Sequence, residues 1–248
     1  MACKLNILQE IERARDLGQT LLAQLIDPDF IRSIDHLIDI IQSAEKAGVD
    51  FFFFGGSLIE QSQEVDFIKV IKEISGVPII IFPSSPNQIN ENADGILFLS
   101  LISGRNPEFL IGNQILAAPL LRKSNLEILP TGYMLISCGE KTTAEYISNT
   151  ASIPYSKDGI AATTALAGQY LGLKLIYLDG GSGAEKTVSP EMVKRVKHTV
   201  EVPVVVGGGI KSVNDAFQLS KAGADLLVVG NEAEKNPNFI AELCEKMK

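Results

Sequence analysis

The sequence predicts a (β/α)8 TIM barrel, and three observations support this fold class. Short apolar runs, rich in β-branched and aromatic residues, recur along all 248 residues, and most contain few polar positions. Such runs are typical of parallel strands that are buried on both faces. Amphipathic helical patterns lie between most of the runs, as a parallel barrel requires. No stretch has the composition of a linker, so we expect a single TIM-barrel domain over residues 1–248.

Eight segments are the expected strands, and in the last three the apolar run stops abruptly at glycine. Each is short and bounded by residues that favour turns. In chain order they are residues 21–27, 50–57, 78–83, 95–101, 131–137, 174–180, 203–209 and 225–231.

Four helical patterns alternate with these strands. Residues 30–48 place Ile34, Leu37, Ile38 and Ile41 on one face and end at Gly48. Residues 64–76 repeat this pattern, and residues 212–223 begin at a serine and end at a glycine. In residues 189–200 the first serine is an expected N-cap and the following proline fits the first helical position.

Two connections depart from the regular alternation. Residues 84–94 are only 11 residues long, which is marginal for a crossover helix with two turns, so we expect an irregular or very short element there. Residues 138–173 form a much longer connection, which is a common place for substrate specificity. Its helical pattern over residues 160–172 is rich in small residues, and it either lines an apolar groove or packs on the barrel in the ordinary way.

Charge and hydropathy exclude several classes of protein. The formal net charge is −8 and the pI is about 4.9, so neither a general nucleic-acid binder nor a polybasic membrane anchor is expected. No run approaches the roughly 18 apolar residues of a membrane span. Residues 1–18 carry charges throughout and lack the apolar core of a secretion signal.

The cysteines and histidines indicate a cytoplasmic protein without a thiol or imidazole centre. Cys3, Cys138 and Cys244 are scattered and odd in number, as expected for reduced thiols. His36 and His198 both fall within predicted helices, which argues against a histidine-rich metal site or a serine triad.

Glycine clusters at the ends of the last three strands predict a phosphate site. In a TIM barrel these strand ends lie side by side, and phosphate commonly binds there on backbone N–H groups. Glycine lets the backbone approach an anion and adopt positive φ. The alternative is that the glycines only form tight turns. The residues concerned are Gly180, Gly181, Gly183, Gly207, Gly208, Gly209 and Gly230, with Ser182 and Asn231 beside them.

Carboxylates at other strand ends are candidates for a metal site and for accepting a proton from the substrate. Asp27 and Asp29 follow the first strand and Ser57 follows the second, and together they form a plausible Mg²⁺ seat. The alternatives are a turn carboxylate before Pro28 and a helix N-cap at Ser57. Asp179 ends the sixth strand beside the expected phosphate, where it could hold and deprotonate a substrate hydroxyl; its alternative is an Asx turn. Two anion-binding regions across one barrel mouth suggest two phosphorylated substrates.

Eight motifs in chain order resemble the geranylgeranylglyceryl phosphate synthase family, in particular its group II branch. The resemblance covers nearly the whole chain, and it implies a TIM barrel in which the third helix is missing. The motifs are LIDPD, FFGGS, FPSSPNQI, ADGILFLSLISGRNP, TGYMLIS, YLDGGSGA, VVVGGGI and VGN.

The resemblance also implies an activity. A Mg²⁺-dependent prenyltransferase of this kind alkylates the C3 hydroxyl of sn-glycerol 1-phosphate with geranylgeranyl diphosphate or a similar long prenyl diphosphate, and releases diphosphate in ether-lipid synthesis. It implies a cytoplasmic homo-oligomer, a dimer or a hexamer, and leaves transient membrane contact open. By position, Asp27 and Ser57 would contact Mg²⁺ and Asp179 would be catalytic. The implied glycerol 1-phosphate contacts are Tyr177, Leu178, Asp179, Gly180, Gly181, Ser182 and Gly183, with Gly208, Gly209, Gly230 and Asn231 at the phosphate.

The sequence departs from the family pattern at two positions. Asp179 stands where the family commonly has glutamate, so the side chain is one methylene shorter, and Ser84 replaces a usual glycine. The sequence is also compatible with two other functions. One is a different phosphate-binding barrel enzyme, such as a sugar-phosphate isomerase or cyclase, which would need an acid and a base on opposed strand ends. The other is a carrier or scaffold without turnover.

Overall fold

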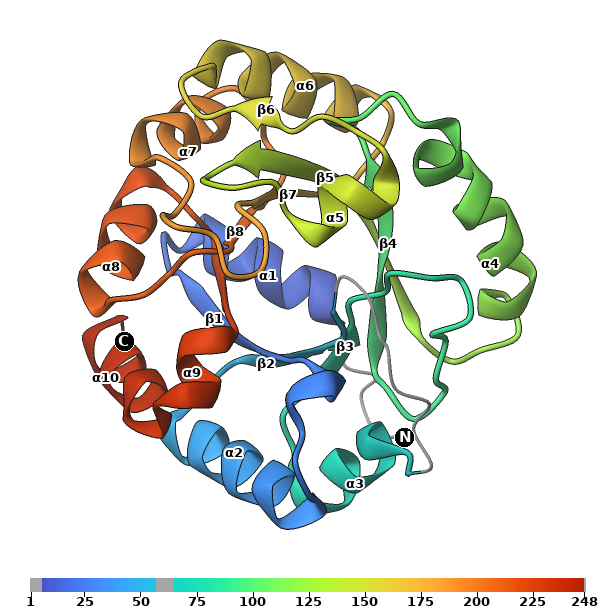
Figure 1. Cartoon of the computed structure of the whole chain (residues 1–248), viewed down its shortest axis with the longest axis vertical. Coiled ribbons are helices and arrows are strands. Elements are labelled where there is room, and N and C mark those ends of the chain that lie inside the picture. The colour runs from blue at the N-terminus through green and yellow to red at the C-terminus, as the bar shows by residue number, and fades with distance from the viewer. Residues whose placement is uncertain (1–5, 57–64, 248) are drawn as a thin grey trace.

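The computed structural model describes residues 6–56 and 65–247, and in it eight parallel strands close into a barrel surrounded by helices (Figure 1). β1 pairs with both β2 and β9, and β4 pairs with both β3 and β5, so the sheet closes on itself. The predicted fold class is confirmed. The barrel strands are β1 (Leu21–Ile26), β2 (Phe51–Phe54), β3 (Ile79–Ile81), β4 (Gly95–Leu101), β5 (Glu127–Ser137), β7 (Leu175–Asp179), β8 (Val204–Gly207) and β9 (Leu226–Val229).

All eight expected strands are present, with small differences at their ends. The largest is in β5, which begins at Glu127 rather than at Thr131. The extra residues pair with the start of β4, where Gly95 lies opposite Glu127 and Phe98 opposite Pro130.

Helices cover the outside of the barrel, and most follow the expected alternation. The helical elements are α1 (Ile7–Asp16), η1 (Pro28–Phe30), α2 (Ile34–Ala47), α3 (Phe67–Ile74), the π-helical turn η2 (Glu108–Gly112), α4 (Asn113–Leu121), α5 (Thr143–Ser148), α6 (Asp158–Tyr170), α7 (Pro190–Lys197), α8 (Val213–Ala222), α9 (Asn231–Lys235) and α10 (Pro237–Met247). A two-residue strand, β6 (Ile153–Pro154), pairs with the end of β5 outside the barrel.

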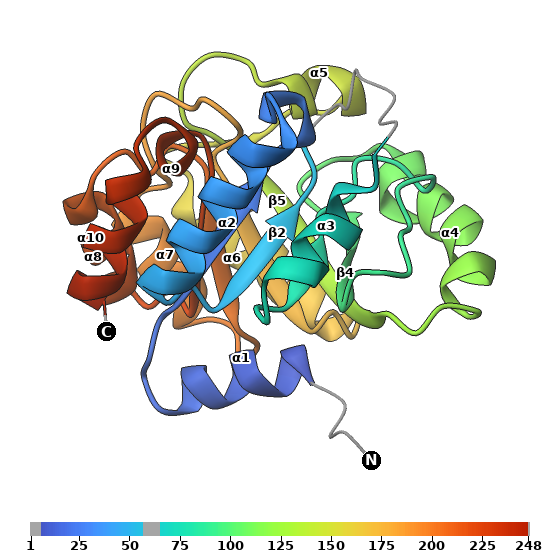
Figure 2. The same ribbon diagram turned by 90° about the horizontal axis from the view of Figure 1, so that it is seen from below.

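Local sequence signals set the ends of these helices. Ser189 accepts a hydrogen bond from the Met192 N–H at the start of α7, which confirms the expected N-cap. Gly48 ends α2 in the left-handed region, with φ of 93°. The buried face of α2 differs from the expectation, because Ile34 is 43% exposed whereas Ile40 and Ala44 are buried. The first turn of α2 stands at the rim of the barrel (Figure 2).

An unexpected helix closes the amino-terminal end of the barrel. α1 lies across that opening (Figure 2), and Ile7 and Ile11 are fully buried in the cluster of side chains that fills the barrel. The Glu127 carboxylate at the start of β5 accepts hydrogen bonds from the backbone N–H groups of Ile7, at 2.7 Å, and Leu8, at 2.9 Å. The barrel is therefore open to ligands at the carboxyl ends of its strands.

The connection between β3 and β4 has no helix. Residues 82–94 are all described and contain only turns and extended backbone. Ser84 lies in this connection, and its backbone N–H donates to the Gln88 side chain at 2.7 Å. The expected absence of a helix between β3 and β4 is confirmed. The side chains of Ile79, Ile81 and Ile96 are nevertheless buried.

Truncating Ile11, which α1 buries in the end of the barrel, tests how far the stability of the fold depends on α1. We expect Ile11→Ala to lower the free energy of unfolding by about 2–5 kcal/mol, because the substitution leaves a cavity among fully buried side chains. Urea denaturation followed by circular dichroism measures this loss. Leu17→Ala is the control, because Leu17 directly follows α1 and is 61% exposed, and it should change the midpoint little. A loss at Ile11 no larger than at Leu17 would show that α1 is dispensable.

Candidate functional site

A cavity of about 300 Å³ opens at the carboxyl ends of the barrel strands and continues outside the barrel beneath α4. Its mouth is lined by Asp27 from the end of β1, Asp179 from the end of β7 and the glycine turns after β7, β8 and β9. Two strand ends that are far apart in the sequence therefore share one opening.

The three glycine turns meet at one rim, as the sequence predicted. Gly181, Gly208 and Gly209 have positive φ of 89°, 82° and 68°, backbone conformations that residues other than glycine rarely adopt. A Cβ at Gly208 would lie 2.6 Å from the Gly181 nitrogen and 2.8 Å from Asp179 Oδ1. Glycine at position 208 thus allows the turn after β8 to pack directly on the turn after β7.

The turn after β9 joins the same rim. Ser182 Oγ donates to Asn231 Oδ1 at 3.3 Å, which links the turn after β7 to the start of α9. Gly183, Gly230 and Asn231 all line the cavity. The opening thus presents backbone from three successive strand ends to one ligand-sized space.

Two of the predicted contact residues lie behind this rim. The Leu178 side chain is fully buried in the layer between barrel and helices, away from the mouth. Gly180 donates its N–H to the Gly207 carbonyl at 2.9 Å and packs against the Cys138 side chain. Burial raises the pKa of that thiol to about 12, so Cys138 stays protonated at neutral pH. These residues support the turn from behind.

Asp179 is held by two hydrogen bonds in a nearly closed environment. Its Oδ1 accepts from the Gly181 N–H at 2.7 Å, which is the Asx turn considered above, and its Oδ2 accepts from the Tyr133 hydroxyl. The residue is 7% exposed. Burial raises the pKa of Asp179, while the bonds from Tyr133 and Gly181 oppose that rise. A raised pKa brings a carboxylate closer to the range useful for accepting a proton.

Tyr133 is a site residue that the sequence analysis missed. It lies within β5 opposite Tyr177 on β7, and the two ring centroids are 5.5 Å apart at 85°. Phe82 packs on both rings, at 5.8 Å from Tyr133 and 5.5 Å from Tyr177. A tyrosine inside a strand carries no signal that separates a core residue from a site residue.

Asp27 stands on the opposite side of the mouth. It is half-buried, and its Oδ1 accepts from the Asp29 N–H at 3.1 Å, the turn role considered as an alternative. A Cβ at Gly56 would lie 2.7 Å from Asp27 Oδ2, so glycine there lets the backbone after β2 pack closely on the carboxylate. Burial raises the pKa of Asp27, and the bond from Asp29 opposes this. Ser57, the other predicted metal contact, lies outside the described residues.

Asp27 offers a carboxylate, the type of oxygen ligand that Mg²⁺ binds. Within residues 6–56 and 65–247 no three His, Cys, Asp or Glu side chains gather as a metal site. Mg²⁺ usually takes one or two carboxylates and completes its shell with water and substrate phosphates. A single carboxylate beside a glycine-lined space is consistent with that mode of binding.

Lys211 is a second residue that the sequence analysis missed. It lines the cavity two residues after Gly209, and its Nζ donates to the Glu185 carbonyl at 3.0 Å. The position of a lysine after the GGGI motif is a signal that could have been noticed. Its charge favours an anion at the same rim.

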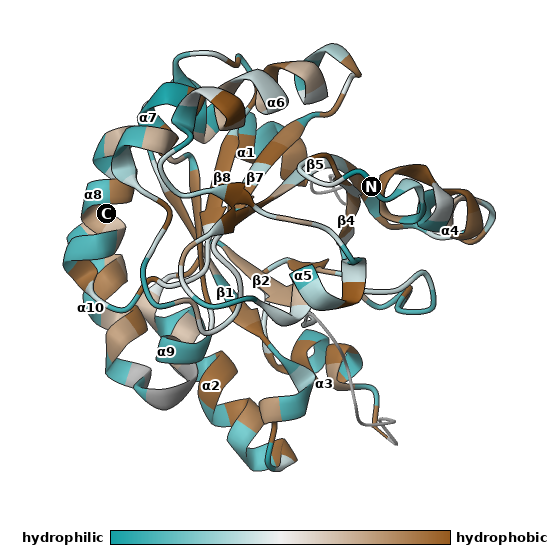
Figure 3. Cartoon of the chain, turned by 45° about the horizontal axis from the view of Figure 1, so that its top comes forward, coloured by the Kyte–Doolittle hydropathy of each residue, from teal (hydrophilic) through white to brown (hydrophobic). Residues whose placement is uncertain are grey.

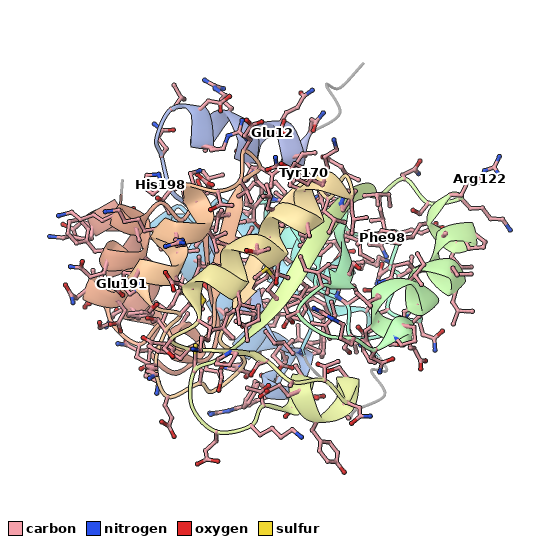
Figure 4. All side chains as sticks on the ribbon, turned by 90° about the horizontal axis from the view of Figure 1, so that it is seen from above. Glu12, Phe98, Arg122, Tyr170, Glu191 and His198 are labelled. Atoms are coloured by element: carbon pink, nitrogen blue, oxygen red, sulfur yellow. The ribbon has the colours of Figure 1, made fainter. Side chains whose placement is uncertain are left out.

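The part of the cavity outside the barrel is apolar. It runs over the outer face of β4 to the inner face of α4, where Phe98 lies between the two elements (Figure 4). Its apolar lining includes Ile96, Phe98, Leu101, Phe109, Ala117 and Leu121. α4 is hydrophobic around much of its surface (Figure 3). This space lies beside the connection between β3 and β4, where a TIM barrel usually has a helix.

α6 does not line this groove. Its small residues Ala161, Ala162, Ala165 and Gly168 are buried, and α6 packs on α7 and the barrel. Of the two expectations for residues 160–172, ordinary helix packing is the one observed.

Comparison with known proteins gives a consistent result. Residues 16–247 match the PcrB family. A relative from Spirosoma linguale, named geranylgeranylglyceryl phosphate synthase, is 49% identical over 91% of this chain and 90% of its own length. A relative of the same name from Sulfolobus acidocaldarius is 41% identical over 98% of this chain and 94% of its own.

Solved structures agree with the sequence relatives. The crystal structure of (S)-3-O-geranylgeranylglyceryl phosphate synthase from Thermoplasma acidophilum, in complex with sn-glycerol-1-phosphate, has a TM-score of 0.92 and 33% identity, and the match covers 98% of this chain and 99% of that one. Tryptophan synthase from Mycobacterium tuberculosis has a TM-score of 0.63 at 16% identity over 98% of each chain, a likeness of fold alone.

Closing the space between the glycine turns tests whether they form an anion site. We expect Gly208→Ala to weaken binding of inorganic phosphate by at least about tenfold, ~1.4 kcal/mol, because the new methyl group meets the Gly181 nitrogen. Isothermal titration calorimetry measures the affinity.

Gly18→Ala is the matched control for this substitution. Gly18 has a φ of 68° and no neighbour within 4 Å of an added Cβ, so the variant carries similar backbone strain far from the mouth. Equal phosphate affinities in the two variants would argue against an anion site at this rim.

Proposed function

The chain belongs to the PcrB family and is a prenyltransferase of ether-lipid synthesis, and we propose that it joins the C3 hydroxyl of sn-glycerol 1-phosphate to a long prenyl diphosphate such as geranylgeranyl diphosphate. The observation that carries this proposal is the shared rim. Glycine turns suited to a phosphate, a carboxylate suited to a hydroxyl and an apolar groove suited to a hydrocarbon tail all open into one cavity.

The acceptor would lie over β7, β8 and β9. Its phosphate would face the backbone of the turns at Gly181, Gly208 and Gly209, with Asn231 and Lys211 beside it. Positive φ at these glycines leaves the backbone accessible to an anion. With the phosphate held there, the glycerol hydroxyls would extend toward Asp179, which lines the same cavity.

The donor would lie across the mouth and into the groove. Its diphosphate would face Asp27, and its tail would follow the apolar lining over β4 to Leu121. Burying a long prenyl chain in such a groove is favourable by about 0.8 kcal/mol for each CH₂ group. The depth of this groove would then set the preferred chain length.

The magnesium ion implied by the family would be held by Asp27, with Ser57 as the second expected protein contact. When bound it would supply neutralisation of the charge on the diphosphate leaving group. The protein itself does the rest: the backbone of the glycine turns fixes the acceptor, and Asp179 receives the proton that the hydroxyl loses as the ether bond forms.

The thiols and the exposed surface bear on where the enzyme is located and what it associates with. Cys138 is a buried thiol outside any disulfide, which supports a cytoplasmic location. None of the described helices has the length and apolar character of a membrane span. The outer face of η2 and α4 exposes Ile111, Ile115, Leu116 and Leu120, which supports association with further copies in a dimer or hexamer, or transient contact with a membrane surface.

A direct assay tests the function. Incubation with labelled sn-glycerol 1-phosphate, geranylgeranyl diphosphate and Mg²⁺ should yield a prenylated ether, and sn-glycerol 3-phosphate should react far less. EDTA should abolish product formation and added Mg²⁺ should restore it. Mass spectrometry of products from donors of mixed length identifies the preferred tail. Absence of ether product with shorter and longer donors alike would contradict the proposal, as would turnover of a sugar phosphate without divalent metal.

Changing the carboxylate on the other side of the mouth tests the ion site. We expect Asp27→Asn to raise the Mg²⁺ concentration needed for half-maximal activity by at least about tenfold, since the charged ligand is lost. Titration of activity against Mg²⁺ at saturating substrates measures this. Asp35→Asn serves as control, because Asp35 is exposed on the first turn of α2. Unchanged Mg²⁺ dependence in the Asp27 variant would exclude this residue as a ligand.

A further inference from the structure

The Asp179 carboxylate is largely enclosed by its hydrogen-bond partners. The residue is 7% exposed, and both of its oxygens already accept hydrogen bonds, from the Gly181 N–H and from the Tyr133 hydroxyl. The turn at Gly208 packs so closely that an added Cβ would lie 2.8 Å from Oδ1. Oδ1 is therefore committed to the glycine turns, and Oδ2 is covered by the phenol.

Tyr133 lines the same cavity beside this carboxylate. It is only partly buried, and its hydroxyl points at Asp179 Oδ2. The rings of Phe82 and Tyr177 hold its ring from two sides, at 5.8 and 5.5 Å between centroids. A phenol oxygen that donates one hydrogen bond still has lone pairs with which to accept another.

We propose that Tyr133 relays the proton, so that the C3 hydroxyl of the acceptor donates to the Tyr133 oxygen while the Tyr133 hydroxyl donates to Asp179. This inference rests on the proposed function and adds a catalytic residue to it. It makes Asp179 the final base and Tyr133 the group that touches the substrate.

The step balances in protons and electrons. The acceptor oxygen uses a lone pair to form the new C–O bond to the first carbon of the prenyl chain. The bond from that carbon to the diphosphate oxygen breaks, and its electron pair leaves with diphosphate. The hydroxyl proton moves to the Tyr133 oxygen, the former phenolic proton moves to Asp179 Oδ2, and the carboxylate becomes a neutral carboxylic acid.

The surroundings of Tyr133 favour a concerted transfer. Burial, and then the negative charge of Asp179, raises the pKa of Tyr133 well above its ordinary value. A free tyrosinate would therefore be costly at this position, so the phenol gains one proton as it gives up the other.

Three variants test the relay. Tyr133→Phe removes only the hydroxyl, and Asp179→Asn removes only the charge. Because the two groups act in one chain, each variant should lower kcat by at least about 100-fold, and the double variant should lose little more. Calorimetric affinity for sn-glycerol 1-phosphate should stay within about threefold in all variants that fold, as judged by circular dichroism. Tyr170→Phe, the same change at a 78% exposed position on α6, is the control and should retain full activity.

A longer carboxylate side chain at position 179 provides a separate test, in which activity should be recovered rather than lost. Adding Asp179→Glu to Tyr133→Phe extends the carboxylate by one methylene toward the space vacated by the phenol oxygen. We expect this pair to recover at least about tenfold in kcat over Tyr133→Phe alone, since the longer side chain can take the proton directly.

The outcomes separate this inference from the proposed function. Ether formation by the unmodified protein tests the function alone. If the unmodified protein makes the ether and Tyr133→Phe keeps more than about a third of kcat, the relay is wrong and the function stands. Losses that multiply in the double variant would also overturn the relay, because they would show that Asp179 accepts the proton independently of Tyr133.

Discussion

Closure of the parallel sheet is the constraint on which the rest of this structure depends. The pairing of β1 with β9 and of β4 with β5 removes both edges of the sheet. All eight strands run in one direction, so every strand delivers its carboxyl end to the same rim. Asp27, Asp179 and the glycine turns are separated by long stretches of chain, yet they line one cavity because the barrel gathers them there.

The same geometry sets the electrostatics of the site. Asp179 stands at a strand end beside closely packed backbone, where desolvation opposes its charge and hydrogen bonds from Gly181 and Tyr133 favour it. Neither influence acts alone, and the two together set the pKa of the carboxylate. Gly208 contributes to this balance indirectly, since a larger residue would displace the turn that closes over Oδ1.

The sequence carried most of the fold and part of the site. Eight apolar runs located all eight strands, and the start of β5 was missed because Pro130 resembles a strand boundary, although it is accommodated opposite Phe98. α1 was missed because its charges obscured the spacing of Ile7, Ile11 and Ala14. The site residues at strand ends were predictable, because a parallel barrel brings the carboxyl ends of all its strands to one rim.

Residues within strands were harder to predict from the sequence. The importance of Tyr133 depends on the direction of its hydroxyl across to β7, and no linear pattern records that direction. Leaving out the helix between β3 and β4 has a wider consequence. Phe98 is only partly buried and lines the cavity beside this connection, where it would contact the proposed prenyl tail. A bound prenyl tail would thus fill space that a helix fills in other barrels. The melting temperature of the protein would then rise with the concentration of the prenyl donor.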